Sequence, residues 1–173
     1  VEVNAHLGQG LEVASGAVGV GVDGPGHGAM VLERGKGGIG IWIDGPSQFQ
    51  VDNNSFEGLS GAMTVVNSGA KNEWKQNFIR CNAIQNTVWG IDFYGENRHA
   101  QFLGNQFQSV ESDMLLRGDA SIKGRIRTNQ GGPGSPASNC FDSPLGGDII
   151  TESSATTESF RYWTPGETSQ PCL

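Results

Sequence analysis

Five ionisable side chains are the first candidates for chemistry in this sequence: Asp44, Asp92, Glu96, Arg98 and His99. Asp92 lies between two apolar residues of a predicted strand, so its side chain should point away from the core. The last three follow in the next loop. Carboxylates beside a cation or an imidazole can act as general acid and base on a glycosidic bond. The alternative is that all five are solvated surface residues, as ionisable side chains usually are.

Tryptophan side chains offer a second chemistry, the stacking of sugar rings. Trp42 and Trp89 flank inward positions of two predicted strands. We therefore expect them on the surface, where an indole face can bind a pyranose ring by apolar contact. Trp74 is instead expected in the core beside Phe49 and Phe102.

Other chemistries find little support in the residue pattern. The histidines at 6, 27 and 99 are not spaced as metal ligands, and no Gly-x-Ser-x-Gly motif accompanies them. Asp23 and Asp44 each stand in Asp-Gly-Pro, which is typical of a turn. Calcium needs several converging oxygen ligands, and one aspartate per unit is too few. We predict no metal and no cofactor, with calcium as the only remaining candidate.

The composition predicts an all-β domain. The chain has 173 residues, 27 of them glycine, and a charged fraction of 17%, below the roughly 25% of ordinary domains. Glycine is costly inside helices, whereas the many Asn, Ser, Thr and Val residues suit turns and strands. A net charge of −7 without a basic cluster argues against nucleic acid and anionic membrane surfaces. No apolar stretch approaches the roughly 18 residues of a membrane span.

A repeated segment organises the first 130 residues. Residues 19–25 (GVGVDGP) recur as residues 40–46 (GIWIDGP), 21 positions later. Weaker copies place closing glycines at 24, 45, 69, 95 and 118, which is 94 residues over four steps, or 23.5 per unit. An asparagine close to an aromatic residue also recurs, with the same period as these glycines. Each unit reads as short strands joined by glycine and asparagine corners.

A unit of this size cannot bury its apolar face alone and must stack on its neighbours. The predicted fold is a right-handed parallel β-helix of about five coils over residues 1–130, with a C-terminal capping segment over 131–173. Asparagines at equivalent corners should form a ladder that satisfies their buried amides. The rival fold is a β-sandwich or jelly roll, which would not require successive strand pairs to resemble each other.

The three cysteines leave one unpaired. Cys140 and Cys172 flank the polar C-terminal segment, so we predict a disulfide between them and a free thiol at Cys81. Such a bond implies an oxidising compartment. The alternative is that all three cysteines are reduced.

Residues 54–63, 82–95 and 102–107 resemble the right-handed parallel β-helix repeats of the pectate-lyase-like superfamily, over about residues 10–130. Together with residues 139–142 (NCFD) and a C-terminal stretch that begins YWTP at 162 and ends at Cys172, the chain also resembles large secreted or surface-exposed proteins of Bacteroidetes-type bacteria exported by the type nine system. The resemblance implies an extracellular scaffold, often a module of a longer adhesin.

The leading functional hypothesis is therefore a non-catalytic structural or adhesive module, secreted or on the cell surface. Its expected partners are a glycan, another cell-surface component or further copies of itself, stacked end to end. One alternative is a polysaccharide lyase or glycoside hydrolase that uses the five ionisable candidates. Another is a carbohydrate-binding module that uses Trp42 and Trp89.

Overall fold

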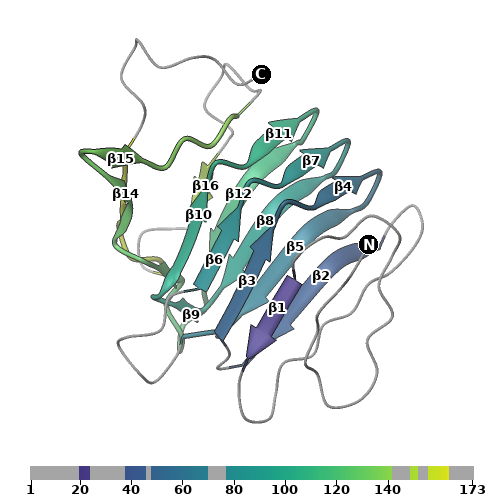
Figure 1. Ribbon diagram of the computed structural model, residues 1–173. Helices are drawn as coiled ribbons and strands as arrows, with labels where there is room; N and C mark the ends of the chain where they lie inside the picture. Colours follow the sequence, from purple (N-terminus) through teal and green to yellow (C-terminus); the bar gives the residue numbers. More distant parts are fainter. Residues whose placement is uncertain are drawn as a thin grey trace.

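The computed structural model describes residues 20–23, 38–45, 48–69, 77–141, 149–151 and 156–163, without the side chains of 20–23 and Gln48. Every regular element in these ranges is a β-strand (Figure 1). The all-β prediction is thus confirmed, and most strand pairs are parallel. No helix in the described ranges is long and apolar enough to cross a membrane.

Three sheets carry most of the strands. The first is a five-stranded parallel sheet in the spatial order β16 (Ile149–Thr151), β12 (Ser112–Arg117), β8 (Trp89–Tyr94), β5 (Gly61–Val66) and β2 (Ile39–Asp44). The second holds β3 (Gln48–Asp52), β6 (Asn77–Arg80) and β10 (Ala100–Leu103), with β1 (Val20–Asp23) at one edge. The third holds β4 (Ser55–Glu57), β7 (Ala83–Gln85) and β11 (Gln106–Gln108).

The chain visits these sheets repeatedly in the same order, and we call each such run a pass. The first pass is β2, β3 and β4, the second β5, β6 and β7, and the third β8, β10 and β11. Neighbouring passes pair in parallel register, so Ile41 lies beside Met63, and Met63 beside Ile91. Figure 1 shows the strands of successive passes side by side. The predicted stacking of repeated units therefore holds for these three passes.

Inward-pointing side chains form the core between the sheets. The first sheet contributes the column Ile41, Met63, Ile91 and Met114, all 0% exposed. The second sheet contributes Val51, Ile79 and Phe102, and the third contributes Phe56, Ile84 and Phe107. Phe49 and Phe102 are buried, as predicted. Trp74 lies outside the described residues.

Corners between the sheets use left-handed backbone at equivalent positions of each pass. Of the eleven described residues with positive φ, ten fall into three columns. The first-corner column is Gly45, Asn67 and Gly95, the second-corner column is Asn53, Cys81, Gly104 and Ser138, and the third-corner column is Gly58, Asn86 and Ser109. Glycine adopts this conformation freely, and asparagine tolerates it better than other residues do.

Two details of the predicted repeat are wrong. The first error concerns the closing glycine predicted at position 69. The residue in register with Gly45 and Gly95 is Asn67. Asparagine can replace glycine at a left-handed corner, which hides the repeat from a glycine count. Gly24 lies outside the described residues.

The second error concerns β1, which belongs to the copy at residues 19–25. It does not lie on β2 but runs antiparallel to β3, with Val22 opposite Phe49. A local sequence favours a strand and a turn, whereas the pairing partner depends on the rest of the sheet. The resemblance between residues 19–25 and 40–46 therefore does not translate into stacking.

Beyond β12, β16 continues the first sheet, and the other described strands form two further small sheets. β13 (Arg125–Ile126) pairs with β9 (Glu96–Asn97), and β14 (Asn129–Gly132) forms a hairpin with β15 (Ser135–Pro136). β16 pairs with β12, and β17 (Arg161–Tyr162) pairs with β14, both in parallel. The predicted boundary at residue 130 falls within β14, and the division into two segments stays a prediction.

Candidate functional site

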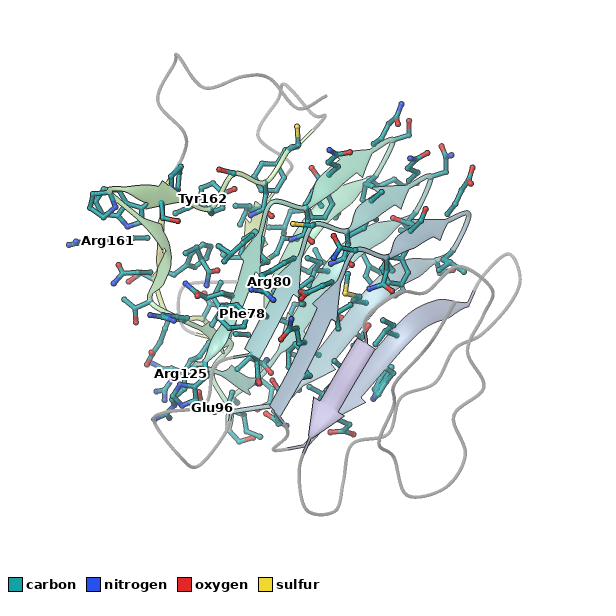
Figure 2. The ribbon with its side chains drawn as sticks, viewed as in Figure 1. Phe78, Arg80, Glu96, Arg125, Arg161 and Tyr162 are labelled. Carbon is teal, nitrogen blue, oxygen red and sulfur yellow. The ribbon has the colours of Figure 1, made fainter. Side chains whose placement is uncertain are left out.

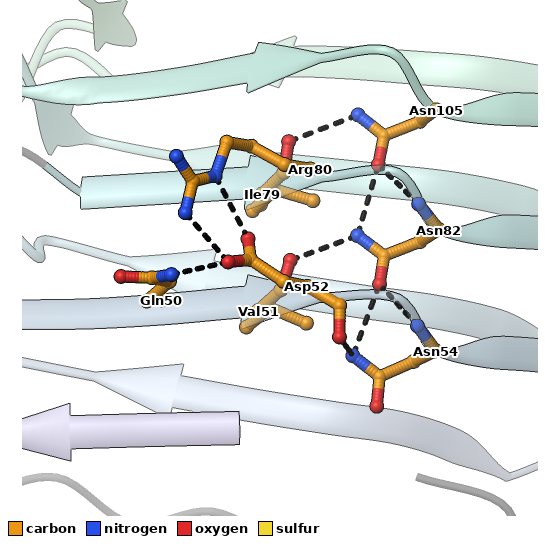
Figure 3. A network of polar contacts seen from close by, with 8 residues as sticks. All are labelled: Gln50, Val51, Asp52, Asn54, Ile79, Arg80, Asn82 and Asn105. Carbon is orange, nitrogen blue, oxygen red and sulfur yellow. Dashed lines mark hydrogen bonds and ion pairs between the residues drawn. The ribbon is translucent and has the colours of Figure 1, made fainter. Parts of the chain in front are cut away.

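Buried asparagines at equivalent corners of successive passes form a ladder of hydrogen bonds, part of which is shown in Figure 3. Its members are Asn54, Asn82, Asn105 and Asn139, each between 0% and 8% exposed. In Asn82, Asn105 and Asn139, Oδ1 accepts from the backbone N–H and the Nδ2 of the preceding ladder member, at 2.9–3.1 Å. Each Nδ2 also donates to a backbone carbonyl. The predicted ladder is confirmed, and its amides are used for structure.

The ladder ends at the hydroxyl of Tyr162. This oxygen accepts from the backbone N–H of Asn139 at 3.1 Å and from its Nδ2 at 3.0 Å. The Tyr162 ring stacks on Phe102, with ring centroids 5.7 Å apart. Burial raises the pKa of Tyr162 above its ordinary value of 10.0, although the Asn139 hydrogen bonds oppose the shift. Tyr162 thus joins the polar ladder to the aromatic core.

Asp92 is committed to an ion pair. Its side chain is 2% exposed and accepts two hydrogen bonds from Arg117, one of them from Nε to Oδ1 at 2.9 Å. Arg117 lies on the adjacent strand β12, and its guanidinium also faces the ring of Tyr94 at 6.0 Å. A buried carboxylate that is neutralised in this way is held in place by the protein itself.

Glu96 belongs to a separate group of charges at the corner after β8. It accepts from Arg98 at 2.8 and 2.9 Å, and Nη1 of Arg125 lies 2.9 Å from Oε2. Arg125 also pairs with Glu158 at 2.6 Å, so the group joins β9, β13 and the segment before β17. Figure 2 shows Glu96 and Arg125 side by side. The hydrogen bond from Arg98, and to a lesser degree the contact with Arg125, lowers the pKa of Glu96 below 4.5.

The remaining ionisable candidates lie apart from these two groups. Asp44 is exposed on β2, and β5 separates that strand from β8, which carries Asp92. His99 is half-buried, and its imidazole makes no hydrogen bond or ion pair in the described part of the chain. The structure therefore joins Glu96 to Arg98 but does not join all five candidates into one constellation.

The two tryptophan candidates differ in their surroundings. Trp42 is half-buried on β2 beside Thr64 of β5, opposite in direction to the buried Ile41 and Ile43. Trp89 lies against Gly61, where an added Cβ would come within 2.1 Å of its Nε1. The Trp89 indole is thus held against the backbone of β5, and Trp42 is the better placed of the two to meet a ligand.

One surface network was not predicted from the sequence. Arg80 donates to both carboxylate oxygens of Asp52, at 2.6 and 3.0 Å, and its guanidinium lies 4.8 Å from the ring centroid of Phe78 (Figures 2 and 3). This hydrogen bonding raises the pKa of Arg80. Gln50 also donates to Asp52. The signal is a spacing of 28 residues between Asp52 and Arg80, the same as between Asn54 and Asn82, but it appears only once the register is known.

Cysteine chemistry and metal binding are two further possibilities for this chain. Cys81 is a free, exposed thiol, and Cys140 is disulfide-bonded. The predicted partner, Cys172, lies outside the described residues, so the pairing itself stays a prediction. No group of three or more histidine, cysteine, aspartate or glutamate side chains in the described ranges is arranged to hold a metal ion.

Comparison with known proteins adds no relative: no family model, no curated protein and no solved structure matches the chain. The interpretation of the site therefore depends on its geometry.

Proposed function

We propose that the chain is a right-handed parallel β-helix that serves as a non-catalytic structural or adhesive module of a secreted or cell-surface protein. Support for the fold comes from three passes in parallel register and from left-handed corners in three columns. Support for an oxidising environment comes from the disulfide at Cys140.

We infer the absence of catalysis from the ion pairs that the acidic candidate side chains form within the protein. Asp92 is paired with Arg117, and Glu96 is paired with Arg98 and Arg125. A general acid or base must reach the proton that it transfers, with a suitable pKa. The buried Asp92 carboxylate, which accepts two hydrogen bonds from Arg117, cannot reach a substrate proton, and the lowered pKa of Glu96 disfavours a role as acid. This pairing is the observation that carries the proposal.

The test is an activity assay on the purified chain. Polyuronates and neutral glucans are incubated with the protein, and unsaturated products and new reducing ends are measured. We expect no turnover above the level of the Asp92→Asn variant. Turnover that disappears in Asp92→Asn or in Glu96→Gln, while both variants stay folded by circular dichroism, would show that the module is an enzyme.

A second candidate function, glycan binding without catalysis, is favoured by one surface. Trp42 is half-buried and stands two residues from the exposed Asp44 on β2. Alternate residues of a strand point to the same face, so an indole and a free carboxylate lie about 7 Å apart. Such a pair suits a neutral sugar, with the ring on the indole and its hydroxyls on the carboxylate.

Titration with neutral oligosaccharides, followed by tryptophan fluorescence and calorimetry, tests this second candidate. Trp42→Ala should abolish binding and Asp44→Asn should weaken it about tenfold, the equivalent of roughly 1.4 kcal/mol. Glu57→Gln changes another exposed carboxylate, on the third sheet, and should have no effect. Equal binding by wild type and Trp42→Ala would remove this candidate.

A further inference from the structure

We propose that Asn53 is an acceptor for an N-linked oligosaccharide. Asn53, Asn54 and Ser55 form an Asn-x-Ser sequence, and no other Asn-x-Ser or Asn-x-Thr occurs in the 173 residues. This pattern is the acceptor sequence for glycan transfer to asparagine in secreted proteins. The inference rests on the secretion that forms part of the proposed function.

The local geometry leaves the Asn53 side chain available. Asn53 follows β3 directly, is exposed and has φ of 58°, as the first member of the second-corner column. Its backbone N–H donates to the carbonyl of Arg80 at 3.0 Å, which fixes the corner. Its side-chain amide makes no hydrogen bond in the described part of the chain. Nδ2 can therefore carry a substituent without the loss of a structural contact.

The neighbouring asparagine could not serve in the same way. Asn54 is 2% exposed, and its Nδ2 donates to Asp52 and to Asn82 within the ladder. Ser55, which completes the acceptor sequence, is exposed at the start of β4. The fold thus directs the acceptor asparagine and its serine to solvent while the residue between them points inward.

The described neighbours of Asn53 along its corner are small. The next members of its column are Cys81 and Gly104, a small exposed thiol and a residue without a side chain. Among the described residues of this column, a first sugar on Nδ2 would therefore meet no bulky neighbour on the side of Cys81.

The reaction conserves atoms and electrons without an oxidant. Nδ2 of Asn53 forms a bond to C1 of the first sugar of a polyprenyl-diphosphate-linked oligosaccharide. The bond between C1 and the phosphate oxygen breaks, and the polyprenyl diphosphate leaves with the electron pair. The displaced amide proton passes to a base of the transferase.

The experiment expresses the full chain behind a secretory signal in a glycosylating eukaryotic cell line. Intact masses are measured before and after treatment with peptide-N-glycosidase. We expect one glycan per chain, whose enzymatic removal leaves aspartate at position 53. Asn53→Gln and Ser55→Ala should each abolish the modification, and Ser55→Thr should keep it. Asn86→Gln is the matched control, because Asn86 is an exposed left-handed corner outside any acceptor sequence.

An unmodified wild-type chain, or a glycan that persists in Asn53→Gln, would overturn the proposal. The chain is measured in medium and cell lysate alike, so the result for Asn53 does not depend on efficient export. Exclusion of the signal-bearing chain from the medium, with Asn53 modified, would instead count against the proposed secreted module.

Discussion

Left-handed corner residues carry different conformational costs. A residue with a Cβ pays roughly 1–2 kcal/mol for this backbone conformation, whereas glycine pays none. The second-corner column holds Asn53, Cys81, Gly104 and Ser138, so cysteine and serine stand where glycine would be less strained.

We expect Cys81→Gly to stabilise the protein by about 0.5 kcal/mol, because relief of strain exceeds the larger entropy of glycine in the unfolded chain. Gly104→Ala is the reverse change in the same column and should cost about 1 kcal/mol or more. An added Cβ there meets only Cys81 Sγ at 3.6 Å, so the cost is conformational. Urea denaturation under reducing conditions measures both. A loss of stability in Cys81→Gly would contradict this account.

Ladder asparagines and corner asparagines should respond differently to truncation. Asn82→Ala leaves the N–H of Asn54 and the carbonyl of Val51 without the Asn82 side chain as partner, and it removes one of the two hydrogen bonds that Oδ1 of Asn105 accepts from residue 82. At about 1–3 kcal/mol for each buried unsatisfied group, the loss should be at least about 2 kcal/mol. Asn86→Ala, at an exposed corner, should cost only about 1 kcal/mol. Equal losses in urea denaturation would show that the ladder adds little.

At two glycines, a strand of one pass lies in close contact with side chains or backbone of its neighbours. Gly61 on β5 lies under the Trp89 indole, and Gly90 leaves room for Phe107 and the carbonyl of Asp113. A parallel strand in register permits such contacts only where a side chain is missing.

Gly61→Ala should displace Trp89 and destabilise the protein by about 1–3 kcal/mol, because the new Cβ would lie 2.1 Å from Nε1. Near-ultraviolet circular dichroism and tryptophan fluorescence report the displaced indole. Gly132→Ala, on β14, meets no atom within 4 Å and is the control. An unchanged tryptophan environment in Gly61→Ala would contradict the observed contact.

Sequence reasoning recovers strand type, core residues and the ladder, because these depend on alternation and residue chemistry. It does not recover the register. The steps between passes are 22, 28 and 23 residues, judged from Ile41, Met63, Ile91 and Met114. The predicted mean step averages over these unequal steps. In addition, the second pass has Asn67 at the corner where the neighbouring passes have glycine, so a search for repeated glycines misplaces this corner. The Asp52–Arg80 and Asp92–Arg117 pairs follow from register, which is why the charged candidates were expected to be more accessible than they are.

On the scale of the whole molecule, the first pass and the C-terminal region differ in how deeply their apolar side chains are buried. In the first pass Ile41, Ile43 and Phe49 are at most 1% exposed. Towards the C-terminus Phe141, Phe160 and Tyr162 are only partly buried against the core. End-to-end association stays a prediction.

Tyr162 should make stability depend on alkaline pH. Because its folded pKa is raised, the folded chain holds the phenol proton more tightly than the unfolded chain. The resulting stabilisation is complete below pH 10 and is lost as pH rises through the folded pKa. Tyr162→Phe should cost about 1–3 kcal/mol near neutral pH and remove this alkaline component. Urea midpoints across the alkaline range measure both. An identical alkaline decline in the variant would assign it to another group.

The uneven register steps have a consequence for protein design. The six additional residues in the second step all enter between β5 and β6, since Val65 and Ile79 are 14 positions apart whereas Ile43 and Val51 are 8 apart. Both neighbouring passes nevertheless keep their pairing. The number of residues between β5 and β6 can therefore vary without loss of register, and a foreign peptide inserted between these two strands should leave the hydrogen-bonded framework on either side aligned.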